Sequence, residues 1–152
     1  MNDFLHFLET SYTAYQAAEN VRTLLQAHGF RELDEGAPWD LQPQGKYFVV
    51  RGGSAVIAFV CGDAKKGFKI AASHLDSPCL KLKENPALSD GHCTRLNAEP
   101  YGGGIWHTFF DRPLRLAGRV VREENGALRA LPFASDFLVS LPSLAIHLDR
   151  EV

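Results

Sequence analysis

Residues 46–78 read KYFVVRGGSAVIAFVCGDAKKGFKIAASHLDSP, and this stretch decides the fold class. Two runs rich in β-branched and aromatic residues flank Gly52-Gly53, a pair typical of a hairpin turn. A third strand-like run at 68–72 ends abruptly in polar residues. In α/β proteins a buried strand that ends in titratable side chains often carries a binding or catalytic site. We therefore expect a hairpin, a third buried strand and an α/β fold.

The sequence before this hairpin predicts an amphipathic helix over 11–28. Apolar residues recur at helical spacing along one face, and Ser11 or Thr13 can cap the first free amides. Gly29 follows in the position where helices usually end. An apolar patch at 4–8 predicts a separate helical turn before this helix.

The chain after Lys83 has a different character. Residues 84–94 are rich in Asn, Pro, Ser, Asp and Gly, which predicts a boundary between domains. Strand-like runs follow at 105–110, 114–121 and 133–139, with turns at 111–113 and 123–126. Because this half shows no helical period, we expect it to be all-β and the first half to be mixed.

The composition is that of an ordinary globular protein, with 152 residues of which 45% are hydrophobic and 22% charged. A net charge of −2 argues against a nucleic-acid partner. The longest purely apolar run, 55–61, is too short to cross a membrane, and an acid near the start argues against a signal peptide. The three cysteines (Cys61, Cys79 and Cys93) form no C-x-x-C pair, which favours reduced thiols and a cytoplasmic location.

His74-Leu75-Asp76 is the sharpest local chemical feature. On an extended strand, residues two apart point the same way. The imidazole can then offer one nitrogen to a metal while the carboxylate fixes its tautomer. The spacing alone is weak evidence, because the chain has a second such pattern at His147-Leu148-Asp149. A hydrogen-bonded structural histidine at a strand end fits the spacing as well.

The glycine run 102–104 invites comparison with a phosphate-binding loop. No Lys followed by Ser or Thr comes after it, so we expect a tight turn or bulge before a strand. His107 is expected on that strand as a partly buried structural residue. Asp111 and Arg112 are expected to form a local ion pair in a turn.

Three segments of the chain resemble the signatures of one peptidase family. They are ASHLDSPCLKLK at 72–83, EPYGGGIWHTFFDRPL at 99–114 and LAIHLDR at 144–150. In this order, and over nearly the whole chain, they resemble the M18 aspartyl aminopeptidases. The opening, from 4–5 to 32–35, is also similar to the start of that family.

The resemblance implies a zinc aminopeptidase that removes N-terminal, preferably acidic, residues from peptide substrates. His74 matches the family's first zinc ligand, and Asp76, the candidate catalytic residue, matches the carboxylate that orients and polarises it. His147 matches a histidine of the family's β-rich domain that reaches towards an active site, where it binds metal or substrate. In the family two zinc ions activate the water that attacks the scissile carbonyl.

The resemblance also implies an architecture. Residues 1–85 would begin an α/β/α catalytic layer, and 86–152 would be part of an inserted β-rich domain. The family's general base and remaining zinc ligands lie beyond the third signature, so we expect the catalytic layer to be incomplete and the isolated chain to be inactive. Family members form large homo-oligomers, commonly dodecamers. The alternative interpretation is a truncated, non-catalytic assembly or binding module derived from that family.

Overall fold

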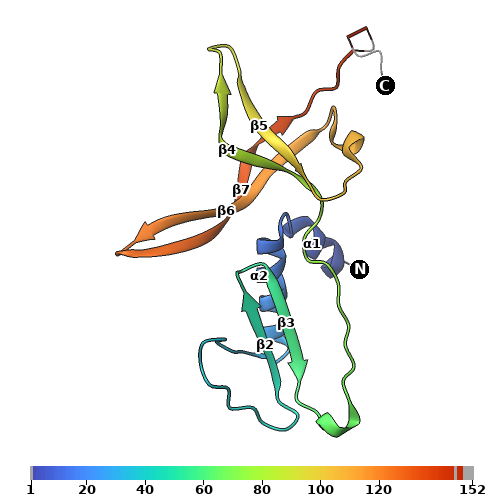
Figure 1. Ribbon diagram of the computed structural model, residues 1–152, viewed down its shortest axis with the longest axis vertical. Coiled ribbons are helices and arrows are strands. Elements are labelled where there is room, and N and C mark those ends of the chain that lie inside the picture. Colours follow the sequence, from blue (N-terminus) through green and yellow to red (C-terminus); the bar gives the residue numbers. More distant parts are fainter. Residues whose placement is uncertain (1, 146, 149–152) are drawn as a thin grey trace. The chain divides into compact units, whose positions relative to one another are not determined.

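The computed structural model describes residues 2–145, 147 and 148, which fall into two compact units (Figure 1). Unit 1 takes in Met1–Asp76 and Ala117–Ala134, and unit 2 takes in Ser77–Leu116 and Ser135–Val152. These units describe packing within the chain. The domain boundary expected at 85/86 stays a prediction.

Unit 1 begins with two helices, α1 (Asn2–Thr10) and α2 (Ala14–Ala27). Thr13 caps α2, because its hydroxyl accepts a hydrogen bond from the amide of Tyr15 at 3.2 Å. Gly29 follows α2 with a φ of +79°, a conformation that costs glycine little. The predicted helix, its cap and its end are therefore confirmed. No helix among the described residues is long and apolar enough to cross a membrane.

The sheet of unit 1 has the order β1 (Arg31–Glu32), β2 (Lys46–Arg51) and β3 (Ala55–Val60). β1 runs parallel to β2, and β2 pairs with β3 in an antiparallel hairpin. Three residues connect the paired Arg51 and Ala55, and the amide of Ser54 closes a β-turn by donating to the carbonyl of Arg51 at 3.2 Å. Gly52 and Gly53 are the two central residues of this turn, with left-handed φ values of +60° and +72°. The predicted hairpin is confirmed.

The described residues bury few apolar side chains. They are Ala17, Ala18, Tyr47, Phe48 and Val49. The first two lie on α2 and the other three are consecutive on β2, so both faces of this central strand are covered. The ring of Phe59 on β3 lies 5.7 Å from that of Tyr47. β2 is thus the centre of the core of unit 1.

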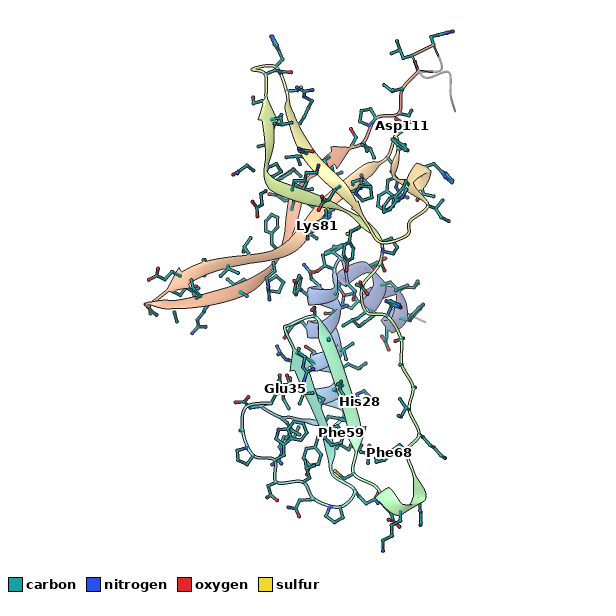
Figure 2. The ribbon with its side chains drawn as sticks, in the orientation of Figure 1. His28, Glu35, Phe59, Phe68, Lys81 and Asp111 are labelled. Carbon is teal, nitrogen blue, oxygen red and sulfur yellow. The ribbon has the colours of Figure 1, made fainter. Side chains whose placement is uncertain are left out.

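The third strand predicted at 68–72 is wrong. No strand forms there, and Phe68 and Ile70 are 82% and 87% exposed (Figure 2). A strand needs a neighbour to accept and donate its backbone hydrogen bonds. β3 ends the strand order of this sheet, and no strand of the described residues pairs with 68–72. The apolar side chains of the segment 68–72 therefore stay exposed.

Part of the chain far from α2 in sequence also packs in unit 1. It belongs to β6 (Pro113–Glu124) and β7 (Ala127–Ser140), which pair as a hairpin. The side-chain amide of Gln16 donates to the backbone carbonyl of Phe133 at 3.0 Å. The guanidinium of Arg119 lies 4.6 Å from the ring centre of Tyr15, a cation–π contact. These contacts attach the distal part of the hairpin to α2.

The turn of this second hairpin is at Asn125-Gly126, with φ values of +52° and +77°. It confirms the predicted turn within 123–126 and the two strand runs on either side of it. Asn and Gly tolerate the left-handed conformation that such a turn requires.

In unit 2, β4 (Cys79–Ser89) pairs with β5 (Thr94–Tyr101) in an antiparallel hairpin. The register shifts between Leu82 and Ala87, and Asn85 inside this irregularity has a φ of +50°. The Asn, Pro and Gly residues of 84–94 therefore lie in a bulge and in a hairpin loop. Composition alone does not distinguish such a bulge and loop from a linker between domains.

The strand predicted at 105–110 is also wrong. The chain forms a short 3₁₀ helix, η2 (Trp106–Phe109), in which the amide of Thr108 donates to the carbonyl of Ile105 at 3.1 Å. The Thr108 hydroxyl donates to the same carbonyl at 2.7 Å. These local bonds satisfy groups that a strand would have to pair with another segment.

Candidate functional site

The structure brings His74 and Asp76 together. The distance between His74 Nδ1 and Asp76 Oδ1 is 3.1 Å, in a part of the chain with no helix or strand. The spacing predicted this approach, although it placed the pair on a strand end. With the proton on Nδ1, the carboxylate accepts it and the lone pair lies on Nε2. The His74 side chain is 93% exposed, so Nε2 is open to a ligand.

His74 would need further ligands to form a metal centre. Within residues 2–145, 147 and 148, no three His, Cys, Asp or Glu side chains gather closely enough to hold a metal ion. Zinc sites in proteins use three or four protein ligands. The donor chemistry of His74 with its carboxylate partner fits zinc as a single nitrogen ligand. No second and third donor gather with His74 among the described side chains.

His147 lies in unit 2, in a turn closed by a hydrogen bond from the amide of Leu148 to the carbonyl of Ala145 at 2.8 Å. Its side chain is exposed. The role of His147 stays a prediction, as do those of His74 and Asp76.

Asp111 makes a set of contacts that the sequence analysis missed. Its Oδ1 accepts from the amide of Ser143 at 3.0 Å, and its Oδ2 accepts from the Ser143 hydroxyl. These bonds, the hydroxyl's first, lower the pKa of the Asp111 carboxyl below its ordinary value. The expected ion pair with Arg112 is wrong, because the carboxylate faces Ser143 and the guanidinium donates to the carbonyl of Thr108 at 3.5 Å. No local pattern reveals a partner 32 residues away.

His107 is placed differently from its prediction as well. It lies on η2, not on a strand, and its side chain is exposed. The glycine run before it does form a turn, since Gly102 has a φ of +79°. An added Cβ there would lie 3.6 Å from Pro78, so backbone conformation, not space, is what requires glycine.

An open groove of about 490 Å³ lies beside Asp111 in unit 2. Its lining residues are Asp111, Arg112, Pro113, Leu138, Val139, Ser140 and Pro142. None of these residues is a histidine or cysteine, and the carboxylate is already bonded to Ser143. This groove is therefore not a candidate metal centre.

Comparison with known proteins places these features in a family. The model of the family described as Aminopeptidase I zinc metalloprotease (M18) matches residues 7–152. Aspartyl aminopeptidase 1 of Schizosaccharomyces pombe is 45% identical over 97% of this chain, which covers 33% of that protein. The chain spans about a third of the length of the curated relatives it matches.

Solved structures agree in fold. A cryo-electron microscopy structure of the Ape4 and Nbr1 complex matches with a TM-score of 0.90 and 42% identity over 97% of this chain and 30% of that one. The dodecamer of mApe1 from S. cerevisiae matches with a TM-score of 0.86 and 28% identity, over 96% of this chain and 36% of that one. The predicted fold class is confirmed, as an incomplete portion of the α/β aminopeptidase fold.

Proposed function

The chain belongs to the M18 family of zinc metalloproteases, and from this we propose that it supplies part of the active site of an aminopeptidase that removes acidic residues from peptide N-termini. The match over residues 7–152 carries the proposal. The acidic preference is supported by the name of the S. pombe relative, an aspartyl aminopeptidase. Zinc is supported by the description of the family and by the donor chemistry of His74.

His74 and Asp76 have distinct tasks in this proposal. His74 would hold zinc through Nε2, and Asp76 is the carboxylate that accepts a hydrogen bond from Nδ1–H. This hydrogen bond selects the tautomer whose Nε2 lone pair is available and makes that nitrogen a better donor. When bound, zinc would supply activation of water and polarisation of the scissile carbonyl, and a site with two such ions belongs to the same proposal.

His147 is the second histidine of the proposal. Its exposed imidazole, held in a short turn, is available to contact a bound peptide or a metal. We expect the isolated 152-residue chain to be inactive, because a zinc site takes three or four protein ligands and no three potential ligands gather among the described residues. Assembly into a homo-oligomer, such as the dodecamer of the mApe1 relative, belongs to the same proposal. So does a cytoplasmic location, which suits three free cysteines.

The test measures zinc content together with release of aspartate from an aspartyl peptide. In a protein that shows this activity, His74→Ala should lose most of the activity and zinc occupancy, whereas His107→Ala, an exposed histidine outside the site, should keep both. Asp76→Asn should weaken zinc binding about 10- to 100-fold, the usual effect of removing such a carboxylate partner. Equal losses from His74→Ala and His107→Ala would show that the site is misplaced.

A different outcome would favour the alternative function. If zinc binding stays below one ion and no aspartate is released even when this chain is part of a polypeptide as long as its relatives, the chain is a non-catalytic assembly module of the family. The specific observation behind this alternative is that no three potential ligands gather among the described residues.

A further inference from the structure

The segment that carries His147 is held by hydrogen bonds more than by packing. It begins where β7 ends at Ser140, and Leu144 and Leu148 along it are 64% and 75% exposed. Burial of apolar surface therefore contributes little to its position. The described contacts of this segment with the rest of unit 2 gather at Leu141 and Ser143.

Asp111 supplies the contacts at both places. Its amide donates to the carbonyl of Leu141 at 3.0 Å, next to a parallel bridge between Phe110 and Leu141. Its carboxylate holds Ser143 through both oxygens, one on the amide and one on the hydroxyl. Hydrogen bonds to an ionised carboxylate are stronger than those between neutral groups. Figure 2 labels Asp111 beside the chain that leaves β7.

The position of Ser143 limits where His147 can be. Three residues lie between the two, which makes four steps from Cα to Cα, so the Cα of His147 lies within about 14 Å of the anchored serine. Without the carboxylate, the nearest anchored residue is Leu141, which limits His147 only to about 21 Å. The volume open to the imidazole then grows about threefold on this chain-length argument.

We propose that Asp111 is a positioning residue for His147: its carboxylate clamps Ser143 and thereby confines the histidine that contacts substrate or metal. This inference rests on the proposed function, which gives His147 that contact. Asp111 acts through the backbone of the segment and touches no reacting group itself. The residue suits this position because its φ is +55°, a conformation that Asp and Asn adopt more readily than most residues.

Three variants separate the carboxylate from the backbone. Asp111→Gly removes the carboxylate and keeps a residue that tolerates positive φ. Asp111→Asn keeps one acceptor oxygen for the amide of Ser143. Asn125→Gly is the matched control, because Asn125 also has a positive φ, +52°, and lies in the turn of the β6–β7 hairpin, outside the segment 141–148. Hydrogen exchange over 143–148 should rise in Asp111→Gly, rise less in Asp111→Asn and stay unchanged in Asn125→Gly.

Kinetics test whether the clamp acts through His147. In a protein that releases aspartate, Asp111→Gly should lower kcat/KM about threefold or more without loss of zinc, and Asp111→Asn should restore part of it. His147→Ala should lower kcat/KM further, and adding Asp111→Gly to it should cost nothing more.

The failures are distinguishable. If Asp111→Gly lowers kcat/KM by the same factor in the His147→Ala variant as in the unmodified protein, the positioning role is overturned and the proposed function stays intact. Unchanged hydrogen exchange over 143–148 in Asp111→Gly has the same meaning. An unaffected His147→Ala enzyme overturns the assignment of His147 and the inference with it.

Discussion

Replacing Phe48 by alanine should cost unit 1 much of its stability. Phe48 is 0% exposed, lies on the central strand β2 and pairs with Glu32 on one side and Ala58 on the other. Truncating a buried phenylalanine to alanine costs about 3–5 kcal/mol, because the lost transfer free energy adds to the cost of the cavity. Whole domains are stable by only about 5–15 kcal/mol, and this core is small.

Phe68 offers a control in which the same atoms are deleted. Its side chain is 82% exposed, so less than a fifth of its surface is buried. Full burial of such a side chain is worth about 1.5–3 kcal/mol, which scales to about 0.5 kcal/mol or less here. Phe48→Ala should therefore lower the free energy of unfolding at least about five times as much as Phe68→Ala does.

Urea unfolding of the 152-residue chain, followed by far-ultraviolet circular dichroism, measures both variants under one set of conditions. Similar losses of unfolding free energy would refute the reasoning. They would show that Phe68 is packed in solution to a similar extent as Phe48.

Three further predictions concern local structure. Thr13→Ala should lower the free energy of unfolding by about 1 kcal/mol through loss of the α2 cap, whereas Thr23→Ala in the middle of the helix should not, as urea unfolding will show. Gly53→Ala should cost about 1–2 kcal/mol because its φ is +72°, whereas Gly62→Ala, where φ is not positive and no neighbour lies within 4 Å, should cost much less by the same assay. Hydrogen bonds from two loop amides lower the pKa of the Asp90 carboxyl below 3.8. Its contribution to the β4–β5 hairpin should therefore be complete above about pH 4 and disappear as the pH falls through the lowered pKa, which an NMR titration and loop amide exchange can follow. Asp90→Asn should remove that pH dependence.

The elements that the sequence predicted correctly have local causes. The helix α2 follows from an apolar stripe, a threonine cap and Gly29. The hairpins β2–β3 and β6–β7 follow from strand-forming runs on either side of residues that adopt positive φ. Each of these signals acts within a few residues along the chain, so a sequence read in short windows contains it.

The contact between His74 and Asp76 also has a local cause, since the two residues are only two positions apart in the sequence. The identity of this pair as candidate ligands came from the resemblance of whole segments to a family. Residue spacing alone favoured a structural histidine.

By itself, then, the sequence determined the family, the mixed and all-β halves, the turns and the local histidine–carboxylate pair. Only the tertiary structure decided that 68–72 has no neighbouring strand, that 106–109 forms the helix η2 and that Asp111 holds Ser143. The physical reason is that a helix satisfies its backbone within its own residues, whereas a strand or a side-chain clamp depends on a partner far away in the chain. Hydrophobicity shows that a segment can be buried, and the presence of that partner decides whether it is.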